Sequence, residues 1–273
     1  MKEERKPRER FLALDTSTAV LAAALMENET VLAESNSRAE RNHAVHVVQA
    51  LEDLMKDQHI ERSEIGGIAV GIGPGSYTGI RIAVTAAKTL AWAWDVPVAT
   101  VSSLEALAWG GLGSFKGNKN VEAATTDIED RAESEQPSYW VIPLMDARRG
   151  QAYTALFEGY DGKNLVNRLE EDGIRLVELW TEKLAAQYEQ TEASSRPAGI
   201  IFAGDVSPHA ETIEKLRERL SCELVLMPYD MEGRYVGKLG SLKLQAGQHD
   251  DVHTLIPNYT QLAEAEANLL RKG

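Results

Sequence analysis

The sequence has little of several residue types, and each shortage excludes a class of protein. Cys222 is the single cysteine among 273 residues, so neither an intrachain disulfide nor a cysteine-based zinc site can form. Basic residues number 29 against 42 acidic ones, for a formal charge of −13. That balance argues against a protein that wraps nucleic acid, because phosphate neutralisation needs a basic stripe. The longest apolar stretches, such as residues 19–26, are too short to span a bilayer. With no signal-peptide pattern after the charged N-terminus, we expect a cytoplasmic protein without membrane contact.

What is present is a regular alternation of strand and helix patterns. Three short apolar segments between residues 11 and 35 predict an antiparallel meander. Apolar residues at helical spacing follow from residue 43 to about 58. The next expected elements are, in order, a strand at 65–72, a helix from 80, a strand at 96–101 and a helix from 103 to about 109. This order predicts an α/β lobe with a mixed sheet and crossover helices.

Composition divides the chain into a tail, two lobes and a connecting segment. Residues 1–10 predict a disordered tail, and 11–110 an N-terminal lobe. Residues 111–137 join a glycine-rich run to an acidic one and predict a linker or flexible insertion. Residues 138–273 form the expected C-terminal lobe, with predicted strands at 139–144, 151–157, 199–203 and 223–227 and predicted helices at 178–190, 208–220 and 235–246. Its opening hairpin carries Asp146 at the turn, as Asp15 does in the first lobe, which indicates either a weak internal duplication or coincidence.

Two turns are candidates for binding a phosphate or Mg²⁺. The turn at residues 73–79 joins a buried strand to a helix start, where free amides and the helix dipole can cradle an anion. The turn at 15–18 offers hydroxyls and a carboxylate. Both patterns are also typical of tight turns without a ligand, and for the glycine turn we favour that interpretation. The candidate nucleotide-binding residues are Asp15, Thr16, Ser17, Gly73 and Gly75.

No metal ligand set or nucleophile emerges from the other reactive residues. His43 and His46 lie three apart on a predicted helix without a visible third ligand. The cluster at residues 249–253 lies in a predicted loop, and we interpret it as solvated. Cys222 has no histidine partner in its local sequence. The sequence therefore predicts no metal site and no catalytic residue, and no cofactor is expected for this chain.

The helix after the glycine turn is small or apolar on most sides. Alanines recur at helical spacing, at positions 83, 86, 87 and 91, which lets another element approach closely. This pattern predicts burial on more than one side, either within the lobe or against a partner subunit. The neighbouring tryptophans at 92, 94 and 109 suit an interface.

Four segments together resemble the TsaB family of bacterial proteins needed for threonylcarbamoyl modification of adenosine in tRNA. They are FLALDTSTAVLAAAL, the block GIGPGSYTGIRIAVTAAKTLAWAWDVPVATVSSLEALA, PLMDARRGQAYTALFEG and IPNYTQLAEAE. The GPGSYTGIR portion is the most specific. The resemblance covers nearly all of the chain except residues 1–10 and roughly 113–137.

The resemblance implies a fold and a set of partners. The fold is the two-lobed actin-like ATPase (ASKHA) kind, α/β in class, with a mixed βββαβα core in each lobe. The role is that of a scaffold and activator for a TsaD-like catalytic subunit and a TsaE-like ATPase, which would use the ATP and Mg²⁺ and carry most of the tRNA contact. Alone, the chain is expected to form a homodimer through the same helices. The interface residues implied are His43, Val47, Leu54, Tyr77, Arg81, Thr85, Lys88 and Trp92.

Departures from the catalytic and nucleotide-binding relatives argue for this accessory role. The TsaD relatives carry an HxxxH metal pair where this chain has Ser103 and Leu107, and neither side chain can replace an imidazole. Residues 146–149 place bulky side chains where a phosphate loop needs backbone, and one glycine, Gly204, stands where a pair is expected. Two alternatives stay open: a stand-alone ATPase or phosphotransferase, and a metallopeptidase, which the missing histidine pair disfavours.

Overall fold

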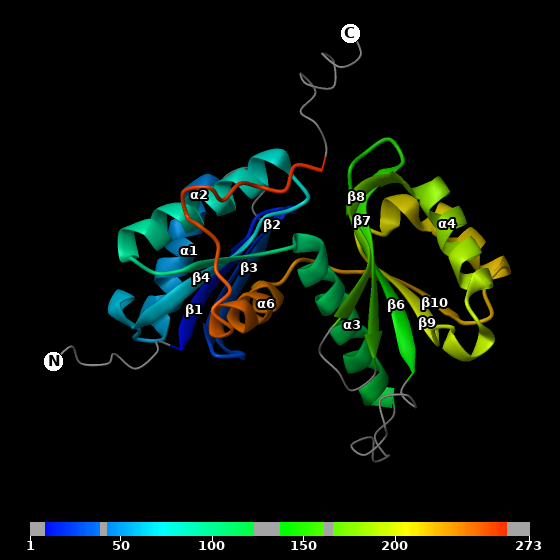
Figure 1. Cartoon of the computed structure of the whole chain (residues 1–273), viewed down its shortest axis with the longest axis horizontal. Helices are drawn as coiled ribbons and strands as arrows, with labels where there is room; N and C mark the ends of the chain where they lie inside the picture. Colours follow the sequence, from blue (N-terminus) through cyan, green and yellow to red (C-terminus); the bar gives the residue numbers. More distant parts are fainter. Residues whose placement is uncertain (1–8, 39–42, 123–136, 161–165, 261–273) are drawn as a thin grey trace, which may run out of the picture.

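The computed structural model of the chain describes residues 9–38, 43–122, 137–160 and 166–260. Two lobes lie side by side, each built on a five-stranded sheet, with one long helix between them (Figure 1). The α/β lobe pattern predicted from the sequence is therefore present twice.

The first sheet has the order β3-β2-β1-β4-β5. Its strands are β1 (Arg10–Asp15), β2 (Val20–Glu27), β3 (Thr30–Arg38), β4 (Ile65–Gly71) and β5 (Val98–Val101). The first three form the predicted antiparallel meander, and β4 and β5 add in parallel to β1. The helices of this half are α1 (His43–Asp57), the short η1 (Arg62–Glu64), α2 (Tyr77–Trp94) and α3 (Ser103–Glu122).

The second sheet repeats the same topology in the order β10-β9-β6-β7-β8. Its strands are β6 (Ser138–Asp146), β7 (Gln151–Tyr160), β8 (Val166–Leu176), β9 (Gly199–Gly204) and β10 (Glu223–Pro228). The helical segments are α4 (Val177–Gln190), η3 (Ala193–Ser195), η4 (Ser207–His209), α5 (Ala210–Glu214), η5 (Lys215–Glu218) and α6 (Gly233–Gln245). The shared strand order supports the internal duplication indicated by the two opening hairpins.

Side-chain alternation along β1 gives the first sheet two buried faces. Leu12 and Leu14 point to the layer of α1 and α2, while Phe11 and Ala13 point to a second core that also holds residues of α3 and α6. A strand buried on both faces is expected to be continuously apolar, which is what residues 11–14 show.

The helices α3 and α6 each pack on the sheet of the other lobe. α3 lies against β6, β7 and β9, whereas α6 returns to β1, β2 and β4. Glycines permit the close approach: a Cβ at Gly111 would lie 2.4 Å from the Cβ of Ala203, and one at Gly240 would lie 2.0 Å from that of Ala69. The domain limits set from composition stay a prediction, but this exchange joins the two halves through one continuous core.

After α6 the chain forms a strap, residues 246–260, along the open edge of the first sheet. Asp250 makes an isolated antiparallel bridge to Val98 of β5, and its carboxylate accepts hydrogen bonds from the backbone N–H and hydroxyl of Thr100 at 2.8 and 2.9 Å. Figure 1 shows this C-terminal strap, in red, rising from α6 across α2 toward the gap between the lobes.

The structure differs from the predicted elements in three places. The helix expected to end near residue 109 continues to Glu122, because Leu112 and Phe115 are buried in the interlobe core and offset the low helix propensity of the glycines. The amphipathic helix expected at 208–220 is divided into η4, α5 and η5. The strand β8 has no counterpart among the predicted elements. The remaining part of the predicted linker, residues 123–136, lies outside the described residues.

Candidate partner-binding site

An apolar groove of about 500 Å³ lies between α1 and α2. The residues that line it are Val47 and Val48 from α1 and Thr78, Arg81, Ile82, Thr85, Ala86, Thr89 and Leu90 from α2. Val48 is 41% exposed, which is high for a valine on a helix that packs on a sheet. An exposed apolar groove rimmed by polar side chains is a candidate site for binding a partner.

The sequence produces this groove because α2 is apolar on two sides. One side, with Ala83, Ala87 and Ala91, is fully buried against its own lobe, which confirms that the small residues serve close packing. Ala86 lies on the other side, in the groove. Ser76 caps the helix by accepting a hydrogen bond from the N–H of Gly79 at 3.3 Å, so the first turn of α2 is fixed.

Four of the predicted interface residues are on or beside this face. Val47, Arg81 and Thr85 line the groove, and Tyr77 is half-exposed at the start of α2. Trp92 is 69% exposed near the other end of the helix, outside the groove lining. Large exposed aromatic side chains are enriched in interfaces, which fits the role predicted for both rings.

Three others lie elsewhere. Leu54 is buried in the core of the first lobe, and it is not among the residues that line the groove. The ammonium of Lys88 donates hydrogen bonds to the backbone oxygens of Leu255 at 2.8 Å and His253 at 3.3 Å, so it holds the C-terminal strap. His43 begins α1, and its side chain lies outside the described residues.

Arg81 is the positive charge of the groove. Its guanidinium lies 5.3 Å from the ring centre of Tyr77, and its Nη1 is 3.5 Å from the hydroxyl of that tyrosine. Within the described residues it has no carboxylate partner. An unpaired guanidinium at the rim of an apolar groove favours a partner that brings a carboxylate.

The five candidate nucleotide-binding residues are brought together beneath the start of α2. Asp15 is fully buried; its Oδ1 accepts the N–H of Ser17 at 2.6 Å and its Oδ2 accepts the hydroxyl of Ser103 at 2.5 Å. Burial raises the pKa of Asp15, and the hydrogen bonds from Ser103 and Ser17 oppose that rise. The hydroxyl of Ser103 in turn accepts the N–H of Gly73 at 3.0 Å.

Polar groups of Thr16, Ser17 and Ser76 in the two turns are also engaged in hydrogen bonds within the protein. The hydroxyl of Thr16 donates to the backbone oxygen of Gly79 at 2.6 Å. The N–H of Ser76 donates to the backbone oxygen of Ser17 at 2.7 Å. A Cβ at Gly75 would lie 2.4 Å from the same Ser17 oxygen. These contacts lock the 15–18 turn to the 73–79 turn, and phosphate binding by the five residues stays a prediction.

A small cavity of about 70 Å³ marks the cleft between the lobes. It lies among the β1–β2 turn, the end of β6 and the segment from Tyr229 to Met231, and the guanidinium of Arg38 pairs with Asp230 at its rim. Ligand pockets of cofactor size usually measure about 300–1,000 Å³. In the turn after β6, Arg148, Arg149 and Gly150 adopt positive φ values of 67°, 54° and 74°, so two arginine side chains stand in a backbone conformation that favours glycine.

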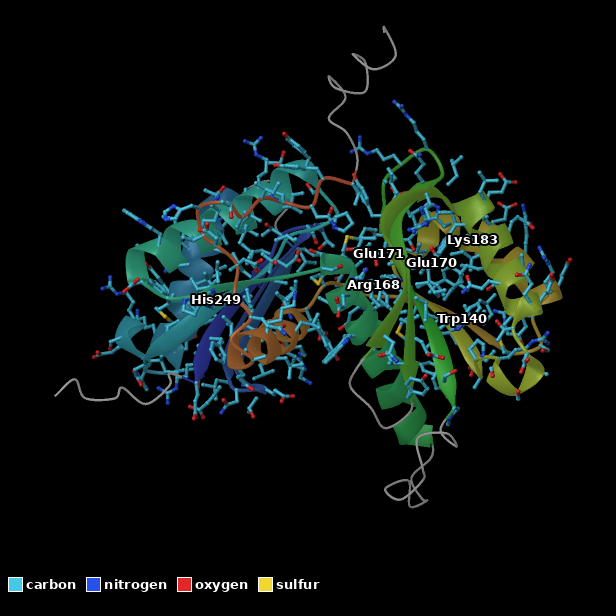
Figure 2. All side chains as sticks on the ribbon, in the orientation of Figure 1. Trp140, Arg168, Glu170, Glu171, Lys183 and His249 are labelled. Atoms are coloured by element: carbon cyan, nitrogen blue, oxygen red, sulfur yellow. The ribbon has the colours of Figure 1, made fainter. Side chains whose placement is uncertain are left out.

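The described residues contain no cluster of three or more potential metal ligands. His209 is buried and its Nε2 lies 3.1 Å from Oδ1 of Asp146, which also accepts the N–H of Arg148 at 3.2 Å. His249 lies at the foot of the C-terminal strap beside α6, on the opposite lobe from Arg168 and Lys183 (Figure 2). Among the described helices, none is long and apolar enough to cross a bilayer.

Comparison with known proteins gives a family for this fold and groove. The model described as "TsaD: tRNA N6-adenosine threonylcarbamoyltransferase" matches residues 31–268. The tRNA threonylcarbamoyladenosine biosynthesis protein TsaB of Bacillus subtilis (strain 168) is 35% identical over 94% of this chain and 96% of its own length. The chain belongs to the TsaB family. By contrast, a tRNA N6-adenosine threonylcarbamoyltransferase of Streptococcus equi subsp. equi is 28% identical over only 34% of this chain and 32% of its own.

Solved structures agree at the level of the fold. YeaZ from Pseudomonas aeruginosa superposes with a TM-score of 0.65 at 21% identity, covering 92% of this chain and 99% of its own. The two-lobed α/β architecture, with a mixed sheet in each lobe, and the family predicted from the four sequence segments are both confirmed. The chain is thus a tRNA threonylcarbamoyladenosine biosynthesis protein by family, and the α1–α2 groove is a candidate binding site on its described surface.

Proposed function

We propose that this chain is a non-catalytic accessory subunit that docks a TsaD-like catalytic subunit through the α1–α2 groove. The observation that carries the proposal is the groove itself, which has a volume of about 500 Å³ and carries at its rim the Arg81 guanidinium, without a carboxylate partner among the described residues. Contact with a helix pair of complementary shape would bury this surface and release its hydration water.

The absence of a catalytic role is supported by what fills the two key positions. Ser103 and Leu107 stand where the resemblance implies metal ligands in the catalytic relative, and both are buried. The Ser103 hydroxyl is committed to Asp15 and Gly73, and Leu107 packs in the interlobe core. The proposed complex therefore takes its metal chemistry from the TsaD-like subunit and its ATP hydrolysis from a TsaE-like ATPase.

The charge of the chain suits an indirect contact with tRNA. A formal charge of −13 repels phosphates, so the partners would supply most of the RNA-binding surface. We place the assembly in the cytoplasm. When the partner is missing, a second copy is the expected occupant of the same groove, although two facing Arg81 side chains near a two-fold axis would repel each other. A carboxylate-bearing partner would be preferred for that reason.

The test is reconstitution of threonylcarbamoyl transfer to tRNA from the purified subunits, with and without this chain. Arg81→Glu places a negative charge against the expected carboxylate of the partner and should reduce co-purification with the TsaD-like subunit at least ten-fold. It should lower tRNA modification in parallel. Arg149→Glu, at an exposed arginine of the second lobe, is the matched control and should change neither.

Two outcomes would contradict the proposal. Full tRNA modification in the absence of the chain would remove the accessory role, and unchanged co-purification of Arg81→Glu would exclude this groove as the docking face. Calorimetry of the isolated chain with Mg·ATP separates the enzyme alternative, because tight binding with turnover would identify a stand-alone ATPase.

A further inference from the structure

The C-terminal strap is fixed to the first lobe at several points along its length. The N–H of Asp250 donates to the backbone oxygen of Val98 at 2.8 Å, and the side chain of Leu255 is buried in the α1–α2 core. Further on, the N–H of Asn258 donates to the backbone oxygen of Ile72 at 2.8 Å, directly before the glycine turn. The strap is therefore ordered against the lobe that carries the groove.

Lys88 ties the strap to α2. Its ammonium donates to the backbone oxygens of residues 253 and 255, as described above. Both oxygens are thereby satisfied on the inner side of the strap. Ile256, the next residue, is 69% exposed. A large apolar side chain held outward on a fixed backbone loses little conformational entropy when a partner covers it.

At its end the strap meets the start of α2 through two tyrosines. The rings of Tyr77 and Tyr259 lie 5.2 Å apart at an interplanar angle of 33°, and both remain about half-exposed, at 50% and 44%. The guanidinium of Arg81 lies over the Tyr77 ring, 5.3 Å from its centre. Arg81 also lines the groove. The groove, Arg81 and the tyrosine pair are thus joined by direct contacts, and the exposed Ile256 precedes Tyr259 on the same strap.

We propose that residues 256–259 of the C-terminal strap are part of the docking surface and contact the same TsaD-like subunit as the groove. The inference rests on the proposed function and extends it. Tyrosine pairs that are apolar on their faces and polar at the hydroxyl are typical central contacts of interfaces. The partner chemistry that fits is an apolar side chain over Ile256 and the tyrosine rings, beside the carboxylate that faces Arg81.

The experiment compares Ile256→Asp and Tyr259→Ala with the wild-type chain in titration calorimetry against the purified TsaD-like subunit. Each substitution should raise the dissociation constant of the complex at least ten-fold. Leu179→Asp is the matched control, since Leu179 is 66% exposed on the second lobe and should leave affinity within two-fold. Thermal unfolding of each variant confirms that the chain is folded before its binding is compared.

Lys88→Met provides a second variant that leaves the exposed side chains intact. Loss of the two hydrogen bonds should make the strap more mobile. Binding should then weaken several-fold, because the strap must be ordered when the partner binds. If the wild-type chain binds but Ile256→Asp and Tyr259→Ala bind equally well, the strap contact is overturned while the groove proposal stands. If the wild-type chain itself does not bind the subunit, both proposals fall together.

Discussion

Asp15 shows how a residue with catalytic chemistry can serve as an anchor. Its two carboxylate oxygens accept hydrogen bonds from the N–H of Ser17 and from the hydroxyl of Ser103 at the start of α3. The residue is 0% exposed to solvent. Gly71 is part of the same fit, because a Cβ there would lie 1.8 Å from Oδ2 of Asp15. The side chain thereby fixes the distance between three segments that are far apart in the sequence.

The pH dependence of stability tests this role. Burial raises the pKa of Asp15, so the folded chain keeps the proton to a higher pH than the unfolded chain, whose aspartates have a pKa of about 3.9. Ionisation therefore costs stability as pH rises through this window. The free energy of unfolding of the wild type, relative to Asp15→Asn, should fall from pH 4 upward and level off above the folded pKa.

Urea unfolding at a series of pH values measures this difference. Asp53→Asn is the control for removal of a carboxylate at an exposed position of α1, and it should change the free energy of unfolding by less than about 0.5 kcal/mol. A wild-type advantage that grows with pH would mean that the hydrogen bonds from Ser17 and Ser103 outweigh burial and that Asp15 is stabilised as a carboxylate.

At the scale of single elements, α2 owes its position to the two locked turns. A Cβ at Gly79 would lie 1.9 Å from the backbone oxygen of Thr16, and that oxygen belongs to a turn that cannot move without breaking the Asp15 contacts. Only the first turn of α2 is held in this way; the rest of the helix is positioned by alanine packing on β4.

Gly79→Ala should therefore destabilise the protein by about 1–3 kcal/mol, as expected for overpacking against fixed backbone. Thr78→Ala, at the exposed neighbouring position, should stay within about 0.5 kcal/mol. Chemical denaturation gives both values. Equal stability of Gly79→Ala and wild type would show that the two turns can separate without cost.

The sequence predicts the elements whose hydrophobic periodicity is clear. It does not predict those elements that depend on contacts with distant parts of the chain. The meander, β4, α1 and α2 have clear periodicity and were placed correctly. β8 was missed because Glu170, Glu171 and Asp172 interrupt its apolar pattern. In the fold these charges are tolerated because β8 is an edge strand, where Glu170 pairs with Lys183 and Asp172 pairs with Arg168.

The same distinction applies to the candidate site, where local patterns are predictable from the sequence and long-range contacts are not. The helical pattern and the family resemblance predicted the α1–α2 face, including Val47, Arg81 and Thr85. No local pattern could show that Lys88 would bond to residues 165 and 167 positions later. Nor could spacing alone decide whether Leu54 faces the sheet or the partner, since both faces of α1 carry apolar residues.

At the scale of the whole molecule, the exchange of α3 and α6 makes each lobe depend on the other half of the chain. Without α6, the faces of β1 and β2 that carry Ala13, Ala22 and Ala24 would lie open to water. Burial of apolar surface contributes roughly 25 cal/mol per Å², and the uncovered face of a five-stranded sheet is large on that scale.

A fragment of residues 9–122 should therefore fail to fold alone, and the full chain should unfold in one cooperative transition. Calorimetry of the full chain and circular dichroism with limited proteolysis of the fragment measure these outcomes. A fragment that resists proteolysis and melts cooperatively, or a full chain with two separate transitions, would show that the lobes are independent units.

The exchange also sets an order of events while the chain is being made. The first sheet is complete once Val101 has been synthesised, but its cover, α6, is encoded about 140 residues later. At roughly 5–20 residues per second, the ribosome needs about 7–30 s to supply it. During that interval an alanine-rich sheet face is open in the nascent chain, so this protein is an expected client of ribosome-associated chaperones, and its yield should depend on translation speed through the second half.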